Sequence, residues 1–215
     1  MKLLSINIGQ KQTQQNGDKL EITGIYKNPT RESVQITSLG IKEDYIASTK
    51  HHGGPDQAIY DYGQADYDWW AKEIGRELSA GTFGDNLTIS ELESAQFNIG
   101  DCLQLGGVIL EVTAPRIPCK TFARRMEDPL FVKKFRHAEK PGLYCRVIQE
   151  GMVQAGDEVK IKKYQGETIS ILQMYRDYYE KNKSEETLRK HLHAPIAIRA
   201  RKDLEEELQK LLAQK

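Results

Sequence analysis

The chain has 215 residues, a hydrophobic fraction of 39% and equal numbers of basic and acidic residues, 31 of each, which suits one substantial domain with a small appendage. A formal charge of zero argues against a nucleic-acid-binding protein, and no stretch is long and apolar enough to cross a membrane. The N-terminal residues turn polar by Asn7, too early for a signal peptide, so we expect a cytoplasmic protein.

The first 165 residues contain many short runs of alternating or β-branched residues, separated by Gly, Pro, Asn and Asp. The predicted strands are 3–8, 20–26, 34–39, 86–89, 101–105, 108–112, 143–148 and 159–161. Strands at this spacing indicate a mainly β fold, a barrel or a sandwich, rather than a doubly wound sheet. Two helices interrupt them, one predicted over 64–78, with Trp70 and Ile74 on its apolar stripe, and one over 128–135.

After about residue 166 the pattern becomes helical. Apolar stripes predict three short helices, the second capped by Ser184 and the third beginning after Pro195. We therefore divide the chain into a β-rich domain over 1–165 and a three-helix unit over 166–215. That unit carries ten basic and nine acidic residues, a net charge of +1, which argues against a DNA-binding helix-turn-helix. Its amphipathic faces fit either a cover over a binding site or a contact in a homodimer.

One cysteine stands in a distinctive setting. Cys119 follows Pro118 in the run Ala114-Pro115-Arg116-Ile117-Pro118-Cys119, directly after a predicted strand. Two prolines end the strand and hold the segment extended, while Arg116 and Lys120 place positive charge on either side of the sulfur, which favours a thiolate. A buried loop cysteine is the alternative. The other two, Cys102 and Cys145, lie in apolar strands and are predicted to be small core residues without disulfides.

Two glycine-containing segments are further candidates for a site. The first is His52-Gly53-Gly54-Pro55-Asp56-Gln57-Ala58, a tight turn in which backbone amides can approach a ligand. His51 and His52 are neighbours that point to opposite faces of an extended segment, so at most one of them belongs to a site. The second is Gly81-Thr82-Phe83-Gly84-Asp85-Asn86-Leu87-Thr88, whose Asp and Asn can hydrogen-bond a polar ring. Alone, the first segment is equally well explained as a capped turn, and the second is better explained as an Asx turn leading into a strand.

In this order, however, the segments resemble the MOSC family, named for the C-terminal domain of molybdenum cofactor sulfurase, and within it the stand-alone bacterial YiiM type. The resemblance rests on residues 52–58, on Phe83-Gly84-Asp85-Asn86-Leu87, on Gly100-Asp101 and on Arg116-Ile117-Pro118-Cys119. It extends over nearly the whole chain, including the helical tail. Asp85 is a departure, because the family often has Glu there. The resemblance implies a MOSC β-barrel followed by three helices.

The resemblance also implies a molybdenum cofactor of the molybdopterin form, with Cys119 as the protein ligand to the metal. Arg116 is then the best candidate to bind the cofactor phosphate. Lys27 matches a family lysine and is a candidate second anchor, with a solvated lysine on a strand as the alternative. The remaining cofactor-binding residues implied are His52, Gly53, Gly54, Asp56 and Asn86. Of these, His52 is also implied as a catalytic proton donor beside Cys119.

The reaction implied by the resemblance is reduction of N-hydroxylated compounds, such as hydroxylaminopurines, to amines and water. The chain has neither a C-x₄-C-x₂-C iron–sulfur run nor a G-x-G-x-x-G flavin loop, so a separate flavin or iron–sulfur reductase must supply the electrons. Two alternatives stay open: sulfur transfer through a persulfide on Cys119, and a cofactor-binding module without turnover. The absence of G-x-S-x-G and H-E-x-x-H motifs disfavours a hydrolase.

Overall fold

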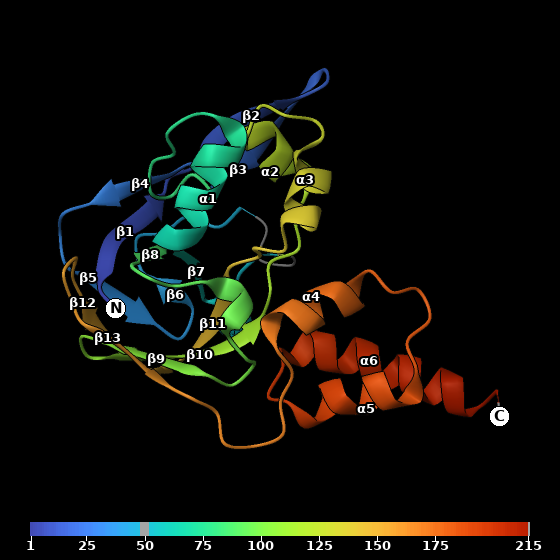
Figure 1. Ribbon diagram of the computed structural model, residues 1–215. Helices are drawn as coiled ribbons and strands as arrows, with labels where there is room; N and C mark the ends of the chain where they lie inside the picture. Colours follow the sequence, from blue (N-terminus) through green and yellow to red (C-terminus); the bar gives the residue numbers. More distant parts are fainter. Residues whose placement is uncertain (48–51, 215) are drawn as a thin grey trace.

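The computed structural model describes residues 1–47 and 52–214, and the sequence prediction about His51 lies outside them. The described strands form three sheets, with six α-helices around and beside them (Figure 1). All eight predicted strands have a counterpart among the observed ones.

The central sheet has eight strands. In spatial order they are β13 (Val159–Lys162), β9 (Cys102–Leu105), β10 (Val108–Ala114), β11 (Leu143–Gln149), β7 (Ile59–Gly63), β8 (Leu87–Ile89), β1 (Leu3–Gly9) and β4 (Lys27–Thr30). All neighbouring strands in this sheet are antiparallel except β7 and β8, which run parallel. The predicted β-barrel is not confirmed, because the edge strands β13 and β4 do not pair with each other in the described chain.

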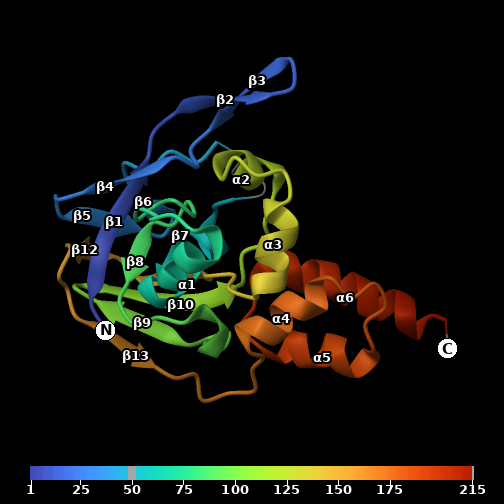
Figure 2. The same cartoon turned by 45° about the horizontal axis from the view of Figure 1, so that its top comes forward.

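Two smaller sheets complete the β structure. One contains β12 (Gly151–Val153), β5 (Val34–Thr37) and β6 (Gly40–Ile41). The other is a hairpin of β2 (Gln12–Asn16) and β3 (Lys19–Thr23), which projects from the rest of the molecule (Figure 2). Arg124 binds the hairpin at two points, through Gln14 Oε1 at 2.8 Å and Glu21 Oε2 at 2.7 Å. The hairpin is therefore fixed to the segment that follows Cys119.

Three helices lie on the sheet side of the molecule: α1 (Gln64–Ile74), α2 (Lys120–Arg125) and α3 (Phe131–Ala138). The first ends earlier than predicted because Gly75 adopts a left-handed conformation and caps it. The three C-terminal helices are α4 (Ile171–Tyr178), α5 (Glu185–His193) and α6 (Ile198–Leu212), in agreement with the predicted stripes. Within the described chain, no helix has both the length and the apolar character needed to cross a membrane.

Two clusters of buried side chains hold these layers together. The larger lies along the central sheet and also includes Leu188 of α5, Leu204 of α6 and Ile196 between these two helices, so the C-terminal helices pack onto the same core as the strands. The smaller is aromatic and centres on Phe83, which stacks on Tyr62 at 4.5 Å between ring centroids. Because the ring of Phe83 is fully buried, it anchors the predicted 81–88 loop.

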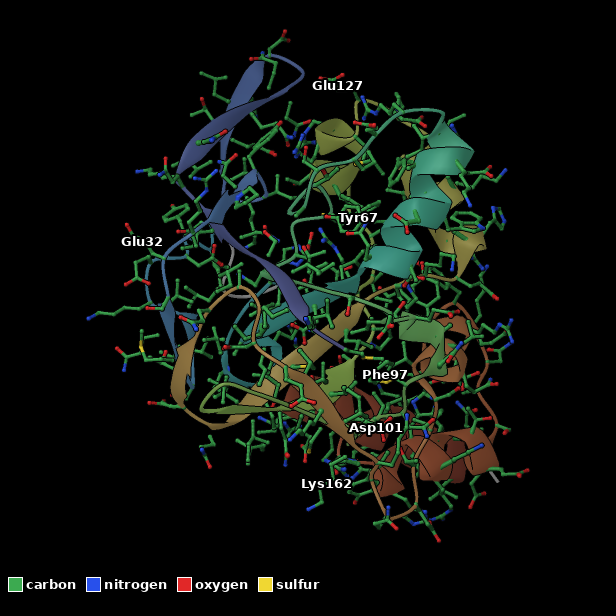
Figure 3. The ribbon with its side chains drawn as sticks, turned by 60° about the vertical axis from the view of Figure 1, so that its left-hand side comes forward. Glu32, Tyr67, Phe97, Asp101, Glu127 and Lys162 are labelled. Atoms are coloured by element: carbon green, nitrogen blue, oxygen red, sulfur yellow. The ribbon has the colours of Figure 1, made fainter. Side chains whose placement is uncertain are left out.

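The segment between the sheet and the C-terminal helices is fixed by one carboxylate. Asp101 is fully buried, accepts hydrogen bonds from the backbone amides of Asn98 and Tyr164, and pairs with Lys163 at 2.8 Å. Figure 3 shows Asp101 and Phe97 where the sheet meets these helices. The Gly100-Asp101 motif therefore has a structural role, at the joint that leads from β13 to α4.

The two cysteines predicted to be core residues differ in burial. Cys145 is fully buried, whereas Cys102 is partly exposed, and all three cysteines are free thiols. The thiol of Cys145 donates to Asp61 Oδ2 at 3.2 Å, and Asp61 Oδ1 has no hydrogen-bond partner in the described chain. Burial raises the pKa of Asp61 from 3.8 to about 7.

We expect Asp61→Asn to remove part of the pH dependence of stability. Since the pKa of Asp61 is higher in the folded than in the unfolded state, the folded state holds more protons between about pH 4 and pH 7, and stability falls as pH rises through that window. Between pH 5 and pH 7 the loss is no more than about 2–3 kcal/mol. Urea denaturation at several pH values should show this decline in the wild type and a flatter profile in the variant. An unchanged profile in Asp61→Asn, or a flatter one in the control Asp18→Asn on the exposed hairpin, would contradict the assignment.

Candidate functional site

The loop at residues 52–57 is shaped by two glycines. Gly53 and Gly54 have φ values of +109° and +83°, a region that disfavours residues with a Cβ atom. A Cβ on Gly53 would also lie 3.1 Å from the Ile46 side chain, whereas Gly54 has open space around it. The loop then enters a single turn, Pro55–Gln57, before β7.

His52 is positioned by a tyrosine from the central sheet. Its Nδ1 lies 3.3 Å from the hydroxyl of Tyr144 in β11, so one of the two groups donates and the other accepts. Burial raises the pKa of Tyr144, which keeps the phenol protonated. His52 and Tyr144 are therefore joined by a hydrogen bond and together can carry a proton at this position. Tyr144 could not be recognised as a site residue from the sequence, since a tyrosine in an apolar strand is an ordinary core residue.

Cys119 ends the extended segment that follows β10 and stands immediately before α2. Its backbone is extended, with φ of −126° and ψ of 172°, and its side chain is half-buried. As the sequence predicted, the prolines carry the chain out of the sheet before this residue. Lys120, the first residue of α2, is exposed to solvent. The helix itself was not predicted, because six residues are too few to show an apolar stripe.

The guanidinium of Arg116 turns into the protein. The residue is only 3% exposed, and its group lies over the rings of Tyr60 and Phe122 at 4.9 and 4.4 Å from their centroids. Its Nη1 donates to the carbonyl of Phe83. Nε has no hydrogen-bond partner, and no carboxylate of the described chain forms an ion pair with Arg116. A buried cation without a counter-ion is costly, which points to an anionic ligand.

Lys27, in β4, forms the second buried cationic position. Its Nζ pairs with Asp44, whose Oδ2 also accepts from Asn86 Nδ2 at 2.9 Å. Burial is the main reason that the pKa of Lys27 is lowered, and Asp44 opposes this effect. Asn86 is held from its other side, because its Oδ1 accepts from the amide of Tyr60 at 3.2 Å. Asp44, an isolated acid in a loop, could not be recognised from sequence.

Asp85 has an internal role. It is fully buried, and its carboxylate accepts from Tyr67 Oη at 2.6 Å, Thr88 Oγ1 at 2.7 Å and Asn7 Nδ2 at 3.1 Å. Tyr67 reaches it from α1 (Figure 3). These bonds fix the 81–88 loop, so that Asn86 faces the site while Asp85 does not.

The predicted site residues meet in a cavity of about 130 Å³. Six of the eight line it: Lys27, His52, Gly53, Asn86, Arg116 and Cys119. The cavity shares His52, Cys119 and Tyr144 with a wider, more open groove, which Gly54 and Asp56 line. The carboxylate of Asp56 accepts from the amide of Ile198 at 2.6 Å and lies 3.3 Å from Arg146, so its protein partners are at the start of α6 and in β11.

The donor set limits what the cavity can hold. Nowhere in the described chain do three or more His, Cys, Asp or Glu side chains gather as metal ligands. A metal at Cys119 therefore needs most of its ligands from a bound group, and a thiolate suits a soft metal centre. The buried Nε of Arg116 and the buried Oε1 of Gln57, both without partners, are suited to polar atoms of such a group.

The chain is similar to several known proteins. The family model for the MOSC domain matches residues 48–160. The protein YflK of Bacillus subtilis (strain 168) is 34% identical over 170 residues, which cover 79% of this chain and 76% of YflK. A protein named as a reductase, from Gibberella moniliformis, is 30% identical over 169 residues, but the match covers only 30% of that protein. The crystal structure of YiiM from Geobacillus stearothermophilus superposes with a TM-score of 0.79 at 25% identity, covering 96% of this chain and 98% of that one.

Proposed function

The chain belongs to the MOSC domain family, and from that premise we propose that it is a molybdenum-cofactor enzyme that reduces N-hydroxylated compounds to amines. The observation that carries the proposal is the convergence on one cavity of Cys119 and the buried guanidinium of Arg116, whose Nε has no hydrogen-bond partner among the described residues. A soft metal ligand and an anion-binding group are the two protein contacts that a molybdopterin phosphate cofactor requires. The reductase name of the fungal relative also supports the reaction type.

Individual residues have separable roles in this proposal. Cys119 is the metal ligand, Arg116 binds the phosphate by two parallel N–H groups, and Lys27 is a second anchor. The backbone at Gly53 lets the cofactor approach closely. Asn86 acts by fixing Asp44 and thereby Lys27, since both ends of its amide are already bound within the protein. Asp56 acts by fixing the loop rather than by direct contact.

The reaction R–NHOH to R–NH₂ and water breaks the N–O bond and consumes two electrons and two protons. The bound cofactor supplies the two-electron redox centre. His52, hydrogen-bonded to Tyr144 and lining both the cavity and the groove, delivers one proton to the departing oxygen, and solvent in the groove supplies the second proton to the nitrogen and reprotonates His52. The electrons come from a separate flavin or iron–sulfur reductase, for which the cytoplasm is the proposed compartment.

The test is the metal content and activity of wild-type protein produced in a host that makes the cofactor. We expect about one molybdenum per chain and turnover of an N-hydroxylated aryl amine with reduced methyl viologen as donor. The same protein from a host unable to make the cofactor should lack both. Protein without molybdenum but with a cyanide-releasable sulfur on Cys119 would refute the proposal in favour of sulfur transfer. Molybdenum without turnover would refute it in favour of a cofactor-binding module.

A further inference from the structure

The open groove outside the cofactor cavity has walls from parts of the chain that are far apart in sequence. Its volume is about 1120 Å³, and it meets the inner cavity at Cys119. Part of its lining comes from the sheet side: the loop 52–57, the segment 114–121, and Asn16 and Glu21 of the hairpin. The remainder comes from Arg124 of α2, from Tyr144 of β11 and from the C-terminal helical unit. The groove is therefore the approach to the candidate metal ligand.

The C-terminal contribution consists of Met174 and Tyr178 from α4 together with the first turns of α6. The residues at α6 are Ala197, immediately before the helix, and Arg199, Ala200 and Asp203. Two of these, Ala197 and Ala200, are among the smallest side chains that the groove contains. The charged Asp203 lies one turn further along the same helix and is exposed. Small residues on the lining of α6 leave the groove wide at this point.

A polar hub fixes the start of α6 against the loop at 52–57. Asp56 accepts from the amide of Ile198 at 2.6 Å, and Arg146 Nη2 donates to the carbonyls of Pro195 and Ile196 at 3.0 and 2.9 Å. Arg146 also lies 3.3 Å from the Asp56 carboxylate, which joins the loop, β11 and α6. The carbonyl of Asp56 accepts from Thr113 Oγ1 at 2.6 Å as well. This helix wall is therefore held in a set position relative to the loop that carries His52.

Apolar side chains from both parts of the protein line the same groove as Cys119. Ile117 and Pro118 belong to the segment before the cysteine, and Met174 and Tyr178 belong to α4. Tyr178 is 58% exposed, which leaves its ring available to a ligand. Aromatic and thioether side chains bind the faces of flat ring systems. The chemistry of the walls thus favours a planar aromatic molecule over a small polar one.

We propose that this groove is the path by which the substrate of the proposed reaction reaches Cys119, and that Ala200 of α6 and Ala197 immediately before it set the size of ring that can pass. The inference rests on the proposed function for the identity of the reacting group. The helical unit is then a specificity element, placed by Asp56 and Arg146. Its first test measures thiol alkylation rather than turnover. The groove assignment and the proposed function can therefore be refuted separately.

The first experiment measures thiol alkylation in cofactor-free full-length protein with Cys102→Ser as background. Cys119 is then the reactive thiol, because Cys145 is fully buried. N-methylmaleimide and N-(1-pyrenyl)maleimide share one reactive group and differ in size. Ala200→Trp should slow the pyrenyl reagent by about tenfold or more while changing the methyl reagent by less than about twofold. Ala213→Trp, at the exposed end of the same helix, should change neither.

A second variant tests the same expectation in case Ala200→Trp fails to fold. Asp203→Trp adds bulk to the groove from an exposed position and should give the same size-selective slowing. Equal slowing of both reagents in this variant, or slowing of neither, would overturn the assignment of the groove as the path to Cys119.

The second experiment applies to the cofactor-loaded enzyme. Tyr178→Ala should raise KM for an N-hydroxylated naphthylamine by about three- to tenfold and leave KM for hydroxylamine unchanged, with molybdenum content as in the wild type. Similar KM changes for both substrates would refute the aromatic preference. If the labelling result holds but no molybdenum is found, the groove assignment survives and the proposed function fails.

Discussion

Replacing Cys119 by serine is expected to abolish molybdenum binding and to lower turnover by about 1000-fold or more. Serine has nearly the same size, so the fold is preserved, but its hydroxyl is a poor ligand for a soft metal and is not ionised near neutral pH. No nearby group can substitute, because the described residues contain no cluster of three or more potential metal ligands. Metal analysis and steady-state kinetics with reduced methyl viologen measure both effects.

Cys102→Ser is the matched control. Cys102 is also a partly exposed free thiol, but its Sγ contacts the Gly100 carbonyl at 3.6 Å and it does not line the cavity. This variant should keep its molybdenum and its turnover within a factor of about two, as expected for a surface change. If Cys119→Ser retained the metal while Cys102→Ser lost it, the ligand assignment would be wrong.

Changing Arg116 to lysine should weaken cofactor binding by about 10- to 100-fold while the metal ligand stays in place. A lysine keeps the charge but loses the planar pair of donors and the bond to the Phe83 carbonyl. Hydrogen bonds to charged groups contribute about 1.5–3 kcal/mol each, which sets this range. Titration of cofactor-free protein with isolated cofactor, followed by molybdenum analysis, measures the loss.

The control for this change is Arg136→Lys on α3. That arginine is exposed, lies over the Tyr179 ring at 4.0 Å and takes no part in the cavity. Its substitution should leave cofactor affinity unaltered. Wild-type affinity in a folded Arg116→Lys variant would show that the buried guanidinium has a structural role only, as a cation packed between Tyr60 and Phe122.

Local sequence patterns predicted most of the elements. Strands such as β10 and β11 were found because apolar residues alternate between turn residues, and the C-terminal helices because their stripes repeat at helical spacing. The elements that were missed are short or polar: β2 has one buried residue in five, and α2 has only six residues. The predicted barrel is not confirmed, since strand pairing across the sheet depends on long-range contacts that no local pattern specifies.

The residues of the candidate site also fall into two groups: those recognised from the sequence and those that only the structure located. Sequence motifs and the family resemblance identified Cys119, Arg116, His52 and Lys27, because their spacing relative to glycine and proline is local information. That Arg116 turns inward to Phe83, rather than toward solvent beside Cys119, depends on the aromatic cluster that surrounds it. Asp44 and Tyr144 carry no local signal at all.

By itself, the sequence determined the chemical groups available to this protein: a cysteine, Cys119, after a proline-containing extended segment, and a glycine turn next to a histidine. It also showed that the chain has neither a flavin loop nor an iron–sulfur motif. Only the tertiary structure decided which groups meet. It paired Lys27 with Asp44, and it used Asp56 to bind the start of α6, 142 residues away along the chain. The physical reason is that a buried charge must find a partner wherever the packing of strands and helices brings one, and that packing is set by the whole chain.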